Sequence, residues 1–304
     1  MPSEDAHEDV RYLAGSPGRI EILRTIREEP LRPAAITRRV DSTRTTVQRV
    51  LAGFRERRWV VERDATYRLT ATGERVCAAY EGLLDATARA REFAPFAANA
   101  EPIAAEMPAA AFEHGSLTVA TAQDPLAPVD RLIDRFEETE GAAVRSVSPI
   151  VSRTFNEAAM ELLGRGTSIR LVIDERVLET SAETFPEALT RAVDRCDVSV
   201  SVHPDPLGVG LFTDREGPRT CLMAYDDQNT PRALLECADE SVHEWALTWF
   251  DRVRDRSRPL EGVIDDGAIE DDGAIEDDGA IEDDGAIEDD GDDGDGFDGD
   301  PNDG

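Results

Sequence analysis

The stretch DSTRTTVQRVLAGFRERRW, residues 41–59, decides the fold of the first part of the chain. Val47, Val50 and Phe54 follow one another at three and four residues, with Leu51 beside them, so they share one face of a helix. Either Asp41 or Ser42 is expected to cap this helix. The other faces carry hydrogen-bond donors near the amino end, namely Ser42, Thr43, Arg44, Thr45, Gln48 and Arg49. Such donors reach phosphates or base edges in a major groove, although an ordinary amphipathic surface helix shows the same pattern.

The segments on either side complete a winged helix-turn-helix. A helix is expected from the Ser-Pro pair at residues 16–17 to Pro30, and a second, short helix over residues 32–40. After residue 59 the apolar period changes, which predicts a hairpin with strands at 60–63 and 67–69. Three short helices in this order match the helix-turn-helix. Two arginines that flank the tip of the hairpin are expected to touch the DNA backbone or minor groove, and these are Arg63 and Arg68.

The chain is acidic overall but basic around the predicted recognition helix. Its 65 acidic and 33 basic residues give a net charge of -32. Residues 261–304 hold 21 acidic residues and no basic ones, whereas residues 11–75 hold 15 Arg against 8 acidic residues, a local charge of +7. Because polyanions bind basic surfaces, the local charge predicts double-stranded DNA as a partner where the overall charge does not.

All 33 basic residues are arginine, and the chain has no lysine. An acidic, lysine-free composition resembles that of proteins from extreme halophiles, where carboxylates keep a protein soluble in molar salt. Contacts to phosphates weaken in salt, by roughly three to five decades of affinity from 50 to 200 mM for six to ten contacts. In such a host, DNA binding has to depend more on base contacts, groove shape and dimerisation.

The cysteines and the hydropathy indicate where the protein works. The four cysteines are scattered without a C-x-x-C motif, which favours buried free thiols over a redox switch. No apolar run approaches the roughly 20 residues of a membrane span, and no signal peptide is visible. We therefore expect a cytoplasmic protein that has no contact with the membrane.

The rest of the chain predicts a second domain and a tail. A helix from Thr70 or Thr72 to about residue 98 completes a first domain, residues 1–94, and is either a dimer helix or a spacer. The Pro- and Ala-rich residues 95–110 predict a linker. Over residues 111–260 helices and strands alternate first and strands cluster later, which predicts a mixed sheet. The fold class is thus α+β or α/β, a winged helix-turn-helix followed by a mixed α/β effector domain.

The chain ends in an acidic tail, residues 261–304, that contains four copies of DDGAIE. With high charge and few apolar groups, this tail is expected to be disordered. Its Asp-Gly repeats do not complete the spacing of a calcium-binding loop. A solvated tail is the simplest interpretation, and a tail that mimics DNA and competes for the basic face is an alternative.

Residues 16–76 resemble the winged helix-turn-helix of archaeal transcription regulators of the ArsR and TrmB type. The resemblance rests on SPGRIEILRTI, TRTTVQRVLAGFRERRWV and YRLTATGERV. Where such regulators usually have Gly before the wing, this chain has Arg58, which we expect to adopt a positive φ at some energetic cost.

The later part of the chain resembles the FilR1 middle domain of archaeal regulators, which is distantly similar to the TrmB effector domain and the phospholipase D half-barrel. The resemblance to the FilR1 middle domain rests on VRSVSPIVS, ELLGRGTSIRLVIDERVLE, LGVGLFTDR and ALLECADESVHEWALTWFDRVRDRSRPL. Together the two resemblances imply a haloarchaeal transcription regulator.

Enzyme activity is not expected. Phospholipase D chemistry needs a Lys two residues after a His, and this chain has no Lys. Nucleophile-elbow, Walker and dinucleotide-binding motifs are absent from the sequence, and the four dispersed His predict neither a metal nor a cofactor site. His203 lies beside Asp205, but a single His in a turn is more often a loop residue than a base.

A small-molecule effector is expected to bind polar and aromatic groups at the strand ends of the second domain. These candidates are Ser148, Ser152, Arg153, Asp214, Tyr225 and Asp226. Each one, taken singly, also fits a purely structural role.

The sequence therefore predicts a homodimeric, sequence-specific DNA-binding transcription regulator that responds to a ligand. The rival is a winged-helix adaptor that binds proteins instead of DNA. The basic segment decides between them, because an adaptor has no reason to keep Arg and Thr on this face of an otherwise acidic protein.

Overall fold

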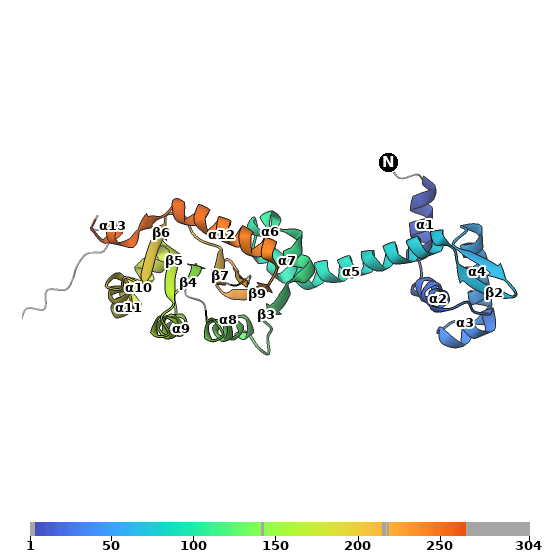
Figure 1. Cartoon of the computed structure of the whole chain (residues 1–304), viewed down its shortest axis with the longest axis horizontal. Helices are drawn as coiled ribbons and strands as arrows, with labels where there is room; N and C mark the ends of the chain where they lie inside the picture. The colour runs from blue at the N-terminus through green and yellow to red at the C-terminus, as the bar shows by residue number, and fades with distance from the viewer. Residues whose placement is uncertain (1–3, 141–142, 215–216, 218, 266–304) are drawn as a thin grey trace, which may run out of the picture. The chain divides into compact units, whose positions relative to one another are not determined.

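The computed structural model describes residues 4–140, 143–214, 217 and 219–265. The amino-terminal part contains a helical bundle closed by a hairpin (Figure 1). Its elements are α1 (Glu4–Ala14), α2 (Pro17–Glu28), α3 (Pro33–Arg39), α4 (Arg44–Glu56), β1 (Val60–Arg63) and β2 (Thr66–Leu69). This order confirms the predicted winged helix-turn-helix.

The apolar face of α4 holds this bundle together. Val47, Val50 and Phe54 are all at most 4% exposed, and they pack in one cluster with residues of α2 and with Trp59. Burying side chains of this size contributes about 1.5–3 kcal/mol each. The spacing of three and four residues therefore places one face of α4 inward and leaves the opposite face to solvent.

The turn residues of the wing carry backbone strain. Val60 pairs with Leu69 and Arg63 with Thr66, so a two-residue turn joins the antiparallel strands. Asp64 and Ala65 have φ of 49° and 59°, as a type I′ turn requires. Arg58, which leads into the wing, has φ of 59°, and this confirms the positive φ predicted where related proteins have Gly.

The linker predicted at residues 95–110 is wrong, because these residues are mostly helical and enter a core. Helix α5 (Ala71–Asn99) begins at the cap Thr70 and continues through Pro95, and α6 (Ile103–Glu106) and α7 (Ala109–His114) follow. Phe93, Phe96 and Ala100 recur at helical spacing and are at most 1% exposed. They pack with the α/β domain, so that domain recruits the end of α5 into its own core.

The second domain is built on an eight-stranded mixed sheet with the order β10-β6-β5-β4-β7-β8-β9-β3. Its strands are β3 (Ser116–Val119), β4 (Ala143–Ser148), β5 (Ser168–Asp174), β6 (Val198–His203), β7 (Val209–Asp214), β8 (Thr220–Tyr225), β9 (Pro231–Cys237) and β10 (Arg258–Pro259). Strands β4, β5 and β6 are parallel, and the other pairings are antiparallel. The predicted mixed sheet with later antiparallel strands is confirmed.

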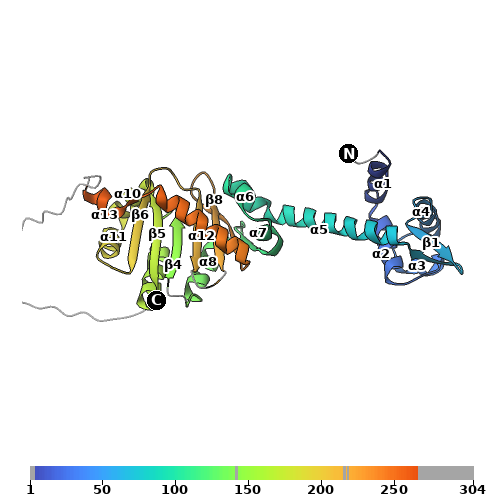
Figure 2. The same ribbon diagram turned by 45° about the horizontal axis from the view of Figure 1, so that its top comes forward.

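Helices cover both faces of this sheet (Figures 1 and 2). They are α8 (Ala127–Glu137), α9 (Arg153–Gly164), α10 (Glu175–Thr184), α11 (Pro186–Val193) and α12 (Glu240–Asp255). Leu222 and Ala224 of β8 belong to the cluster that contains residues of α12, and Cys221, Met223 and Tyr225 belong to the cluster that contains residues of α8 and α9. This alternation follows from the two-residue period of a strand.

The last described residues form α13 (Leu260–Asp265), so the first five residues of the tail predicted to be disordered are helical instead. The remainder of that tail, with nearly all of the DDGAIE repeats, lies outside the described residues. Among the helices that are described, none combines the length and the apolar character needed to cross a bilayer.

Candidate nucleic-acid interface

The cap of the recognition helix is Thr43, so the prediction of Asp41 or Ser42 is wrong. Thr43 has extended backbone angles, φ -74° and ψ 155°, and its hydroxyl accepts a hydrogen bond from the backbone N–H of Thr46 at 3.2 Å. A side-chain oxygen in this place satisfies one of the free N–H groups of the first turn. Thr43 thus has a structural role in addition to its predicted contact with DNA.

The predicted base-reading residues share the solvent face of α4. Arg44, Thr45, Gln48 and Arg49 are all exposed, and their spacing of one, four and five residues keeps them together on the helix surface. Ser42 is half-buried in the turn that precedes the helix. The face opposite the buried Val47, Val50 and Phe54 is therefore lined with hydrogen-bond donors.

The wing adds a second group of cations. Val61 pairs with Arg68 and Arg63 with Thr66, and residues directly opposite one another in an antiparallel pair lie on the same face. Arg63 and Arg68 consequently share the outer face of the hairpin, whereas Val60 and Tyr67, on its inner face, are buried. The structure therefore brings the two predicted wing residues together on one surface.

Several arginine side chains of the interface have no partner. Within the described residues, the side chains of Arg44, Arg49, Arg63 and Arg68 make no ion pair and no hydrogen bond. By contrast, Arg27 bonds Glu81 at 2.7 Å, and Arg57 bonds Asp9 at 2.8 Å while it stacks on Tyr12. In a chain with about two carboxylates per guanidinium, unpaired arginines gathered on one helix and its wing mark a surface kept for an external anion.

One further cation was not singled out from the sequence. Arg38, in the last turn of α3, is exposed and makes no ion pair within the described residues. Its neighbour Arg39 pairs with Glu29. The sequence shows only an Arg-Arg pair here, and only the structure distinguishes the paired arginine from the unpaired one.

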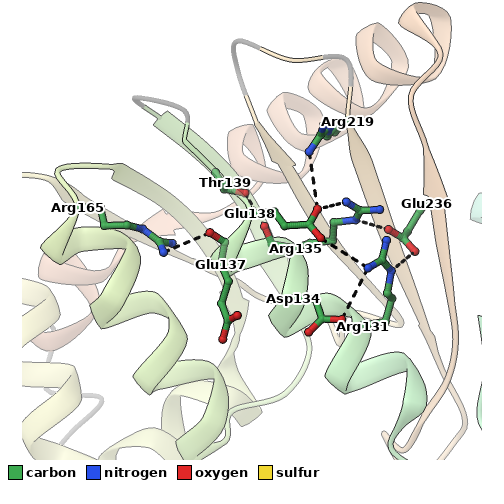
Figure 3. A network of polar contacts seen from close by, with 9 residues as sticks. All are labelled: Arg131, Asp134, Arg135, Glu137, Glu138, Thr139, Arg165, Arg219 and Glu236. Carbon is green, nitrogen blue, oxygen red and sulfur yellow. Dashed lines mark hydrogen bonds and ion pairs between the residues drawn. The ribbon is translucent and has the colours of Figure 1, made fainter.

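In the α/β domain, arginines instead hold elements together (Figure 3). Glu236 of β9 accepts hydrogen bonds from Arg131, at 2.9 Å, and from Arg135, both on α8. Its hydrogen bond raises the pKa of Arg131 above its usual value. Arg135 also pairs with Glu138. This Arg131–Arg135–Glu236–Glu138 group, called the α8 network below, fastens α8 to β9.

The predicted effector residues are not all in one place. Ser148 and Tyr225 line a cavity of about 150 Å³ between the sheet and α9, α10 and α11. Arg153 lies in a neighbouring groove between α9 and α11. Ser152 caps α9 by accepting a hydrogen bond from the N–H of Phe155. Two further candidates lie apart from the cavity lining, Asp214 at the end of β7 and Asp226 in a turn where it pairs with Arg232.

The buried histidines are engaged in structural contacts. Nδ1 of His203 bonds the backbone of Asp205, and Nδ1 of His243 lies 3.0 Å from the hydroxyl of Thr213. Burial lowers the pKa of His243 below its usual value, because it disfavours the charged form of the ring. A cluster of three or more His, Cys, Asp or Glu suited to a metal ion is not found among the described residues.

The fold and the donor-lined face define a winged-helix domain joined to an α/β domain. Family models match both parts. Residues 7–92 match the HVO_A0261 N-terminal domain, and residues 125–256 match the middle domain of the methanogenesis regulatory protein FilR1.

No curated protein matches the sequence. Solved structures with some similarity include TrmBL2, described as an archaeal chromatin protein, at 11% identity and a TM-score of 0.39, over 85% of this chain and 100% of the other. NucT from Helicobacter pylori has 12% identity and a TM-score of 0.40, and the match covers 48% of this chain and 98% of the other. Nuc of Salmonella typhimurium, a phospholipase D family member, has 12% identity and a TM-score of 0.37, and the match covers 48% of this chain and 97% of the other. Values this low carry no information on shared ligands or reactions.

Proposed function

We propose that this chain is a sequence-specific DNA-binding transcription regulator. Helix α4 enters the major groove, where Arg44, Gln48 and Arg49 contact base edges and Thr45 and Ser42 contact phosphates. The wing places Arg63 and Arg68 on the adjacent backbone or minor groove. The observation that carries the proposal is the set of exposed, unpaired arginines on α4 and the wing of a strongly acidic chain.

The domain composition supports the same function. The matched middle domain takes its name from a methanogenesis regulatory protein, and regulators need a part that recognises DNA. In this chain the amino-terminal domain has the fold and the charge for that part. The two buried histidines of the α/β domain are held in structural contacts, so we propose that this domain is regulatory and has no catalytic activity.

Selection of random duplexes on the purified full chain tests the proposal. An enriched sequence is expected, and fluorescence anisotropy then gives its affinity at matched salt. Arg44→Ala and Arg49→Ala should each weaken binding by about 5- to 150-fold, the equivalent of the 1–3 kcal/mol of a bidentate base contact. Arg170→Ala, which removes an exposed arginine without an ion pair from β5 of the α/β domain, is the matched control and should bind as the wild type does.

Two outcomes would contradict the proposal. Selection may enrich no sequence over the starting library, or both recognition-helix variants may bind within twofold of the wild type. Either result favours the adaptor that binds protein partners. The assay is best run at several salt concentrations up to molar potassium chloride, because the composition resembles that of halophilic proteins and phosphate contacts weaken with salt.

We also propose that the regulator is a homodimer joined through α5. Between Ala78 and Glu92 this helix buries no side chain, and it exposes Leu83 by 54% and Leu84 by 39%. A two-fold dimer places two recognition helices on a palindromic site, which is the usual arrangement for helix-turn-helix regulators. Light scattering on the purified chain gives the particle mass, and a monomer at micromolar concentration would contradict this part of the proposal.

A further inference from the structure

We propose that the cavity of the α/β domain binds a neutral, single-ring aromatic molecule with one hydrogen-bonding oxygen. The cavity lies between the sheet face formed by β4, β7 and β8 and the helices α9, α10 and α11, and its volume is about 150 Å³. Apolar cavities of this size in engineered proteins bind benzene. A space this large is unusual in a packed interior and lowers stability when it is empty.

The walls of the cavity are apolar and uncharged. Phe155 and Leu162 of α9, Leu189 of α11 and Phe212 of β7 contribute to them, and all lining residues are uncharged. A charged ligand would have to leave water without a counter-ion, which is strongly unfavourable in such surroundings. The cavity therefore selects a neutral molecule whose body is apolar and flat.

The cavity lining includes hydroxyl groups that are free to bond a ligand. Tyr225, 5% exposed, lines the cavity, and its hydroxyl has no hydrogen bond within the described residues. The hydroxyl of Ser146 likewise has none, and that of Ser148 donates to the carbonyl of Ile150 at 2.6 Å and can still accept. Each of these hydroxyls can still form a hydrogen bond toward the cavity, and an oxygen of the ligand would be its partner.

A glycine leaves room for the tyrosine hydroxyl. Gly210 of β7 lines the same cavity, and a Cβ added at this position would come within 3.2 Å of the Tyr225 hydroxyl oxygen and 3.3 Å of Cε2. The absence of a side chain at Gly210 thus leaves the space that the ring and hydroxyl of Tyr225 occupy beside β7.

The entrance lies beside α11, whose packing is incomplete. None of the eight residues of this helix is buried, although Ala188, Leu189 and Ala192 line the cavity. Ala188 and Ala192, four residues apart on the helix, also line the groove between α9 and α11, which continues from the cavity to solvent. A bound ring would give these side chains the apolar contact that they lack, and α11 is the element expected to respond to the ligand.

Calorimetry on the full chain without DNA tests this site, with phenol, toluene and benzoate as probes. Phenol and toluene should each saturate at one molecule per chain, and benzoate, which has the same ring with a negative charge, should not bind. Tyr225→Phe should weaken phenol binding by roughly 2- to 12-fold, as expected for one lost hydrogen bond, and leave the affinity for toluene unchanged. The unchanged toluene affinity also shows that this variant is folded.

Ala159→Leu is the second variant, because Ala159 of α9 lines the cavity and an enlarged side chain would fill it. It should bind neither phenol nor toluene while it melts no lower than the wild type. The proposal is overturned if either of these two probes fails to saturate the folded wild type, if benzoate binds as tightly as phenol, if Tyr225→Phe leaves phenol unaffected, or if Ala159→Leu still binds.

The role of the ligand as an effector rests on the proposed DNA-binding function, but the site does not. Phenol at saturation should change the affinity for the selected duplex at least threefold in the wild type and not in Ala159→Leu. Unchanged affinity overturns the effector role. If the wild type fails to bind DNA at all but still binds phenol and toluene in calorimetry, the result would count against the proposed function alone.

Discussion

The arginines of α4 and the wing and those of the α8 network differ in what they bind. Arg131 and Arg135 share the carboxylate of Glu236, and their charge is used within the domain to fasten a helix to a strand. Arg44 and Arg49 have no partner in the described part of the chain, although carboxylates outnumber guanidinium groups about two to one. The difference separates charge that stabilises the fold from charge left for another molecule.

The largest expected effect on stability is in the α8 network. Glu236→Gln removes the carboxylate that bonds both Arg131 and Arg135 and leaves the two guanidinium groups to share Glu138, and the side chain of Glu236 is only 11% exposed. We expect the free energy of unfolding to fall by about 1–3 kcal/mol, a value reduced for the partial exposure of both arginines. Urea unfolding followed by circular dichroism measures it.

Glu179→Gln on the surface of α10 is the control for this change, since its carboxylate is exposed and has no ion pair among the described residues. It should alter the free energy of unfolding by less than about 0.5 kcal/mol. DNA affinity should be the same in both variants. Equal stability of the two would show that the α8 network contributes no more than an ordinary surface carboxylate.

A smaller effect of opposite sign is expected at the entry to the wing. Arg58 has φ of 59°, a conformation that glycine adopts without steric cost. Arg58→Gly should therefore raise the free energy of unfolding by about 0.5–1 kcal/mol. Ala52→Gly, at an exposed position within α4, is the matched control and should lower it by about 1 kcal/mol. Destabilisation by Arg58→Gly would mean that its side chain makes contacts worth more than the strain.

The elements that could be predicted from the sequence are those that local patterns specify. The spacing of Val47, Val50 and Phe54 fixes the buried face of α4, and the change of period after Trp59 predicts the wing. Even the strained Arg58 follows from comparison with the usual glycine. Each of these features depends on neighbours within a few residues along the chain.

What the sequence missed depends on distant contacts or on small differences between adjacent residues. Pro95 suggests a break, but Phe93 and Phe96 enter the core of the α/β domain and keep α5 continuous. Thr43 caps α4 where two neighbours were equally suitable. Tyr225 and Ser148 were identified as polar groups at strand ends, yet the cavity they share brings together two strands that lie far apart in the sequence and needs walls from α9 and α11.

The central claim is that the unpaired arginines of α4 and the wing bind DNA, and chemical protection tests it most directly. Phenylglyoxal modifies accessible guanidinium groups, and mass spectrometry of the chain with and without the selected duplex gives the reactivity of each arginine. The account predicts that DNA protects Arg44, Arg49, Arg63 and Arg68 and leaves the exposed Arg153 and Arg170 as reactive as before. Equal reactivity of the four with and without DNA, or protection confined to the α/β domain, would contradict it.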